Sequence, residues 1–219
     1  RATPKADIPE KLSADAIIEK PLVRKKVSTT DLLVAIGAST GGTEAIREVL
    51  EPLPADFPSI VITQHIPPVF SESFANRLDS LCSIRVVHAV EGQEIIRGHA
   101  YIAPGDKHLI VKRSGSRLYC SLNDGPPVNR HKPSVDVMFR SVLQSTGGNC
   151  ISLLLTGMGN DGANGLKELH DHGAFTIAQD ENSSVVWGMP GEAVKLDAVD
   201  AVLPLNNISD VLLRKLPKQ

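Results

Sequence analysis

Short, unbroken apolar runs alternate with stretches of helical spacing along most of this chain, and that alternation limits the folds open to it. Residues 32–36 and 59–63 are typical of strands buried on both faces, and residues 84–88 suggest a third strand. Helical spacing follows the first two runs, at residues 43–53 and 71–81. Strands that alternate with helices indicate parallel strands joined by crossovers.

Closely spaced turn residues interrupt this alternation in the middle of the chain. Residues 100–103, 108–113 and 117–122 are predicted strands, separated by a Pro-Gly and a Ser-Gly pair. Turns this close together are typical of antiparallel hairpins. We therefore predict an antiparallel hairpin excursion near residues 100–122.

The alternation resumes after residue 130. Helices are expected at 134–145, 162–170 and 209–216 and from Pro190, and strands at 151–156, 175–179 and 201–203. The fold predicted is α/β, with an open, mostly parallel sheet flanked by helices.

The first 30 residues differ in composition from the rest. They hold seven Lys/Arg and four Asp/Glu, and three prolines interrupt them, so that only residues 12–18 suit a short helical turn. We interpret residues 1–30 as an interdomain linker or tail, with a partner-docking arm as the alternative, and residues 31–219 as one folded domain.

Composition excludes several classes of protein. No apolar run approaches the roughly 18 residues that span a bilayer, and no secretory signal is recognisable. The net charge of −2 gives no electrostatic reason to expect nucleic acid or an anionic membrane. Three widely spaced cysteines argue against a disulfide framework or a zinc site. We expect a cytoplasmic protein that is not inserted in a membrane.

Chemically capable side chains follow three of the predicted strands, at the edge where parallel sheets bind ligands. The first strand leads into residues 37–42, Gly-Ala-Ser-Thr-Gly-Gly, which place Ser39 in a Gly-x-Ser-x-Gly turn before a helix. In that context Ser39 suits a nucleophile and the Thr40 N–H an oxyanion donor. Taken alone, the turn favours a hydrolase, with a phosphate or nucleotide site and then tight packing as the alternatives.

A base and an orienting carboxylate are available at the other two strand ends. His65 follows the second strand and Asp161 follows the strand at 151–156, so both could join Ser39 in a triad. The competing interpretation of His65 is a histidine that caps the strand. The competing interpretation of Asp161 is an N-cap of the helix at 162–170, a role that Asn160 could also fill. His88 is the main rival base.

Cofactor sites find little support in the motifs. The glycine turn matches neither Gly-x-Gly-x-x-Gly nor a Walker A loop, and the second strand ends in Gln64 and His65 where a dinucleotide site needs an acid. No His-Glu-x-x-His pattern is present. We expect neither an organic cofactor nor a metal.

Over residues 32–205 the chain resembles the catalytic domain of the chemotaxis receptor methylesterases (protein-glutamate methylesterase, CheB). The motifs that carry the resemblance lie at residues 36–42, 64–67, 101–105, 133–139, 156–162, 178–181 and 186–190. The resemblance implies a triad of Ser39, His65 and Asp161. It also suggests that Thr40 and Met158 line the site, and it offers the Met158 backbone as a second oxyanion donor.

The activity implied by the resemblance is hydrolysis of glutamate γ-methyl esters, on the cytoplasmic domain of chemotaxis receptors, to glutamate and methanol. Deamidation of receptor glutamines is a second implied activity. One position departs from the family pattern, because Gly191 stands where a basic residue is expected, which questions any substrate or partner contact made there.

The resemblance also implies a phosphorylatable receiver domain before the linker, and the absence of an initial Met fits a fragment of a longer protein. Two other classes stay open. One is a different serine hydrolase, such as a peptidase or small-molecule esterase, and the other is a non-catalytic binding module of the same fold.

Overall fold

A computed structural model of the chain describes residues 11–20 and 32–216. Its main sheet has seven strands in the order β10-β9-β8-β1-β2-β5-β3, and every neighbouring pair is parallel. These strands are β1 (Leu33–Ala38), β2 (Ser59–Gln64), β3 (Arg85–His88), β5 (His99–Ile102), β8 (Cys150–Leu154), β9 (Phe175–Gln179) and β10 (Ala201–Leu203). The open, parallel α/β fold predicted from the alternation is confirmed.

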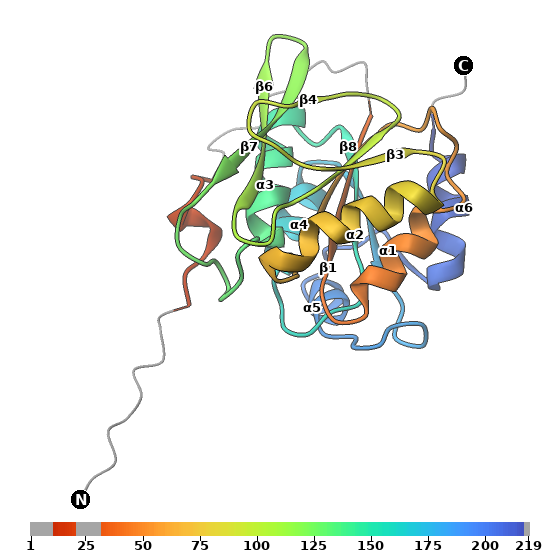
Figure 1. Ribbon diagram of the computed structural model, residues 1–219. Coiled ribbons are helices and arrows are strands. Elements are labelled where there is room, and N and C mark those ends of the chain that lie inside the picture. Colours follow the sequence, from red (N-terminus) through yellow and green to blue (C-terminus); the bar gives the residue numbers. More distant parts are fainter. Residues whose placement is uncertain (1–10, 21–31, 217–219) are drawn as a thin grey trace, which may run out of the picture.

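Helices cover both faces of this sheet (Figure 1). They are α1 (Gly42–Leu50), α2 (Pro68–Leu81), α3 (Val135–Thr146), α4 (Ala163–Asp171), α5 (Met189–Lys195) and α6 (Leu205–Arg214). Strand β1 explains the arrangement, because Val34 and Ile36 pack with α1, α2 and α6, whereas Leu33 and Ala35 pack with α3, α4 and α5. A strand with apolar residues on both faces needs helices on both sides.

A second, antiparallel sheet has the order β4-β7-β6, from β4 (Glu94–Ile95), β6 (His108–Ser114) and β7 (Arg117–Asn123). It packs on α3, where the Ser141 hydroxyl accepts a hydrogen bond from Val111 N at 2.9 Å. The predicted hairpin is confirmed for β6 and β7.

The hairpin excursion is shorter than predicted, because β5 does not belong to it. Strand β5 lies between β2 and β3 in the main sheet and is parallel to both. Its residues Ala100, Tyr101 and Ile102 are almost completely buried, as expected of a central strand. The Pro-Gly turn after β5 indicates where the strand ends but not which strand it pairs with, since pairing depends on tertiary packing.

Part of the predicted linker lies against the domain. Residues 11–20 contain a short 3₁₀ helix, η1 (Ala14–Ala16), within the segment expected to form a helical turn. Ala14 is buried there with Val128 and Val137. The rest of the predicted linker lies outside the described residues.

None of the helices in residues 11–20 and 32–216 combines the length and the apolar character that a bilayer-spanning helix needs.

Candidate active site

Three adjacent strands bring the predicted site together. Strands β8, β1 and β2 are neighbours in the sheet, and their carboxyl ends point the same way. Ser39 follows β1, His65 follows β2, and Asp161 lies in the loop after β8. The chain continues from β1 to β2 on one side and from β8 to β9 on the other. The carboxyl ends of β1 and β8, called here the switch-point edge, are therefore the place where open α/β sheets bind ligands.

The turn that carries Ser39 is fixed by its backbone. Ser39 N donates to Thr156 O at 3.0 Å, and Ser39 O accepts from the Gln64 side-chain amide at 2.8 Å. Gly41 has a φ of 80°, which favours glycine, and a Cβ on Gly42 would lie 2.1 Å from Gln64 Oε1. The two glycines thus permit the tight turn that holds Ser39, half-buried, at the start of α1.

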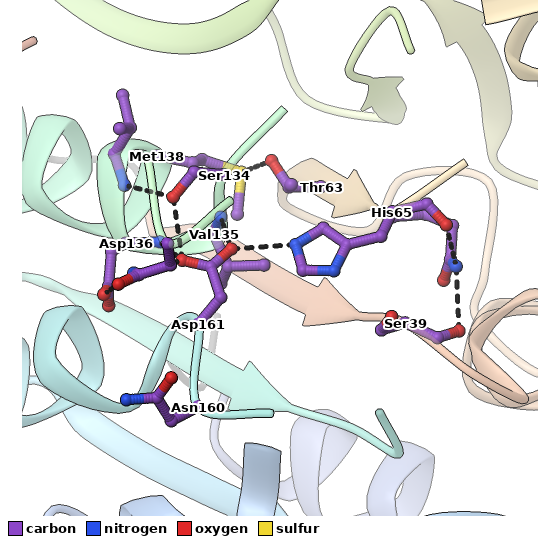
Figure 2. A network of polar contacts seen from close by, with 12 residues as sticks. Ser39, Thr63, His65, Ser134, Val135, Asp136, Met138, Asn160 and Asp161 are labelled. Carbon is purple, nitrogen blue, oxygen red and sulfur yellow. Dashed lines mark hydrogen bonds and ion pairs between the residues drawn. The ribbon is translucent and has the colours of Figure 1, made fainter. Parts of the chain in front are cut away.

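His65 and Asp161 form a buried pair. His65 Nε2 lies 2.8 Å from Asp161 Oδ2, and the two side chains are 9% and 0% exposed. The other ring nitrogen, Nδ1, is buried without a hydrogen-bond partner among the described residues, and its edge of the ring is turned toward Ser39 (Figure 2). In the described part of the chain no hydrogen bond joins Ser39 Oγ to the ring. A neutral His65 that donates from Nε2 therefore has a free lone pair on the side of Ser39.

Asp161 accepts hydrogen bonds from the start of helix α3 (Figure 2). Val135 N donates to Oδ2 at 2.7 Å, and Asp136 N and the Ser134 hydroxyl donate to Oδ1 at 3.3 and 2.8 Å. The Asn129 side chain adds a bond of 2.8 Å to Oδ1. The N-terminus of a helix stabilises a carboxylate in this way through its free N–H groups.

This arrangement corrects one of the alternatives considered for Asp161. The following helix, α4, has Gly162 at its N-cap and receives no side-chain cap bond. Asp161 instead accepts hydrogen bonds from the free N–H groups of α3, a helix that comes before it in the sequence. Sequence spacing could not reveal this, because a cap is normally sought on the helix that the residue precedes.

The pKa values of two neighbouring buried carboxyl groups, Asp161 and Asp136, are shifted in opposite directions. Burial alone would raise the pKa of Asp161, but the hydrogen bond and charge of His65 and the donors Asn129 and Val135 hold that pKa below its usual value. Burial, followed by the charge of Asp161, raises the pKa of Asp136 to about 7. The site therefore keeps Asp161 as the charged member of the pair.

Two other histidines make contacts that the sequence did not indicate. His131 stacks on His65 with ring centroids 3.7 Å apart and planes at 10°. Burial, and then the charge of His65, lowers the pKa of His131. His88, the rival base, ends β3 on the far side of β2 and β5 and lies 3.0 Å from the Ser71 hydroxyl. It is therefore not a partner of Ser39.

The remaining candidates flank the same edge. Thr40 is exposed next to Ser39, and Met158 is 64% exposed in the loop after β8. Gly157 approaches Ser39 so closely that a Cβ on it would lie 2.7 Å from Ser39 Cβ, a supporting role not found from the sequence. Gly191 is buried in α5, where a Cβ would lie 3.0 Å from the Trp187 ring, so a side chain there would require the indole to shift slightly.

Among the residues that the structure describes, no group of three or more His, Cys, Asp or Glu side chains is arranged to hold a metal ion.

The fold and this edge define an α/β protein with a serine, a histidine and a buried aspartate at the switch point of a parallel sheet. Comparison with known proteins makes the assignment specific. Residues 34–212 match the family model of the CheB methylesterase, and the chain belongs to that family.

Its relatives include proteins named protein-glutamate methylesterase/protein-glutamine glutaminase. The one from Hydrogenovibrio crunogenus is 57% identical over 95% of this chain, and the one from Pectobacterium atrosepticum is 52% identical over 99% of it. The chain spans only 56% and 61% of the lengths of these two relatives. The crystal structure of the Thermotoga maritima CheB methylesterase catalytic domain matches with a TM-score of 0.83 and 36% identity, over 87% of this chain and 100% of that domain.

Proposed function

We propose that this chain is a serine esterase domain that hydrolyses glutamate γ-methyl esters on the cytoplasmic domain of chemotaxis receptors. The observation that carries the proposal is the buried His65–Asp161 hydrogen bond of 2.8 Å, with the free Nδ1 edge of the ring turned toward Ser39. Membership of the CheB methylesterase family gives the ester as the substrate class.

In the proposed mechanism Ser39 Oγ attacks the ester carbonyl carbon while His65 Nδ1 takes the hydroxyl proton. Asp161 stays ionised, fixes the ring through Nε2–H and stabilises the imidazolium that forms. The tetrahedral intermediate collapses when His65 gives its proton to the methoxide, so that methanol leaves and an acyl-enzyme remains. Water then attacks with His65 as the base, and release of the glutamate carboxylate regenerates Ser39.

The oxyanion of each tetrahedral intermediate needs N–H donors at the same edge. We assign this role to the backbone N–H groups of Thr40 and Met158, which follow β1 and β8. A primary amide reacts by the same steps with ammonia as the leaving group. Glutamine deamidation is therefore the second activity proposed, and the names of the relatives support it. None of these steps requires a cofactor.

The setting proposed for the chain is cytoplasmic, on methylated receptors, within a longer protein. The relatives are longer than this chain, which spans 56% and 61% of two of them. We assign a phosphorylatable receiver domain, joined through residues 1–30, to the additional length.

Methanol release from receptor membranes carrying labelled methyl groups tests the activity and the triad together. Ser39→Ala and His65→Ala should each lower the rate by about 10⁴–10⁶-fold, and the double variant should lose little more, since the residues act as a unit. Ser73→Ala, which removes an exposed hydroxyl on α2, is the matched control and should keep full activity.

A substrate panel separates the alternatives. Release of amino termini from unmethylated receptor would indicate a peptidase, and hydrolysis of simple esters without methanol release from receptor would indicate a small-molecule esterase. Receptor binding with no turnover would leave a binding module. More than about a tenth of the activity retained in Ser39→Ala would contradict the mechanism.

A further inference from the structure

Residues 11–20, called here the N-terminal strap, lie against the domain beside helix α3 (Figure 1). Ser13 caps the η1 turn, and the side chain of Ala14 is 3% exposed in an apolar cluster with Ile110 and Val137. The strap thus has a defined place on the domain although its composition resembles a linker.

A buried arginine anchors the middle of the strap. The Arg140 side chain, 4% exposed on α3, donates from Nη1 to Asp15 Oδ1 at 2.6 Å and to Ile18 O at 3.0 Å. Its other nitrogens hold Glu168 of α4 at 2.9 and 2.6 Å. One guanidinium therefore ties the strap to two helices, with a fork geometry that lysine could not reproduce.

The front of the strap reaches the loops that carry the site. Lys11 Nζ donates to Asn160 Oδ1 at 2.6 Å, one residue before Asp161. Asn129 N donates to Leu12 O at 2.9 Å. Asn129 has a φ of 52°, which few residues other than glycine adopt and asparagine tolerates, so this backbone bond helps to hold an uncommon conformation.

The side chain of Asn129 lies between the two buried carboxyl groups. Its Nδ2 donates to Asp161 Oδ1 at 2.8 Å and to Asp136 Oδ2 at 2.6 Å. One NH₂ group has two hydrogens, so it can satisfy both carboxyl groups and fix the distance between them. A continuous path then runs from the Leu12 carbonyl through Asn129 to Asp161 and on to His65.

We propose that Asn129 is a positioning residue for Asp161 and that the N-terminal strap holds Asn129 in place. The inference rests on the proposed function, in which Asp161 orients the base. Segment 11–20 is accordingly part of the structure that supports the site, and its docking on the domain adjusts the rate of the reaction.

The first test compares two glycine variants of one loop in the whole chain. Asn129→Gly removes the bridging amide, and glycine suits the positive φ at this position. Arg130→Gly is the control, because it removes an exposed side chain from the neighbouring residue, whose φ of 69° also suits glycine. Asn129→Gly should lower kcat about 10-fold with KM within twofold, because the base is misplaced while substrate still binds. Arg130→Gly should change kcat less than twofold.

The second test measures the His65–Asp161 hydrogen bond directly and does not depend on turnover. The ring proton on His65 Nε2 is shielded in the bond to Asp161, and its exchange with water can be followed by proton NMR with ¹⁵N-labelled histidine. Asn129→Gly should accelerate that exchange several-fold, and Arg130→Gly should not. This measurement decides the positioning role even if the chain releases no methanol, so a failure of the proposed activity stays distinguishable.

The strap itself is tested by two charge reversals within it. Asp15→Lys removes the anchor on Arg140, whereas Glu19→Lys makes the same change at an exposed side chain nearby. Asp15→Lys should lower kcat about threefold and accelerate ring-proton exchange, and it should add nothing to Asn129→Gly, because both act through one path. Unchanged exchange in folded Asn129→Gly would overturn the role of Asn129. Equal effects of the two reversals, or full additivity with Asn129→Gly, would overturn that of the strap.

Discussion

At the scale of single residues, the site depends on which nitrogen of His65 faces which partner. Nε2 is bonded to Asp161, which leaves Nδ1 free on the side of Ser39 (Figure 2). Asp161 can hold this tautomer because its own oxygens already accept bonds from the N-terminus of α3. The charge of the aspartate is thus stabilised by α3, which is not one of the elements that position Ser39, His65 or Asp161.

Asp136 gives this arrangement a pH dependence of stability. Its pKa is raised from 3.8 to about 7 in the folded protein, mainly by burial, so the folded state binds a proton that the unfolded state releases. This contribution to the free energy of unfolding is complete below about pH 4 and is lost as the pH rises through about 7. Asp136→Asn does not titrate, and its stability should fall less between pH 5 and 8 than that of the wild type.

Urea denaturation at a series of pH values measures this difference. Glu72→Gln, an exposed substitution on α2 that also removes one carboxylate, is the control and should follow the wild-type curve. Parallel curves for wild type and Asp136→Asn would mean that Asp136 is ionised throughout.

At the scale of elements, the sequence predicted which side chains follow the strands but not which loop residues contact those side chains. Ser39, His65 and Asp161 each follow an apolar run, so their meeting at one edge could be inferred from parallel pairing. Asn129 and His131 lie in an irregular loop between β7 and α3, where no periodicity marks a buried role. The place of β5 was missed for a related reason, because local turn signals do not specify a strand's neighbours.

Helices α3 and α4 are joined through Arg140, and this contact should be measurable as stability. Arg140→Ala leaves Glu168, which is 19% exposed, without its partner and opens the contact to Asp15. We expect a loss of about 2–4 kcal/mol in the free energy of unfolding. Arg117→Ala breaks an exposed ion pair with Glu94 and should cost less than about 1 kcal/mol. If urea denaturation gave the same loss of stability for Arg140→Ala and Arg117→Ala, Arg140 would contribute no more to stability than an exposed ion pair does.

At the scale of the whole molecule, the proposed receiver domain would be joined to the catalytic domain by way of the strap. Lys11 is bonded to Asn160, next to Asp161, so a domain joined before the strap would be tethered near the proposed substrate-binding edge. A short tether gives a high effective concentration, and a receiver domain attached there would compete with the receptor for this edge. Phosphorylation would then act by shifting the population toward the open state.

The prediction is that this chain is faster than the unphosphorylated longer protein on the same methylated receptor membranes. A preference of about 1.4 kcal/mol for the covered state corresponds to roughly 10-fold lower activity, and a phosphodonor should recover most of it in the longer protein only. Asp15→Lys in the longer protein separates the strap's two effects. Because the anchor also shortens the tether, releasing it should weaken the inhibition while lowering the rate of the phosphorylated form. Equal rates for this chain and the unphosphorylated longer protein would exclude occlusion and leave the roles of Ser39, His65 and Asp161 unaffected.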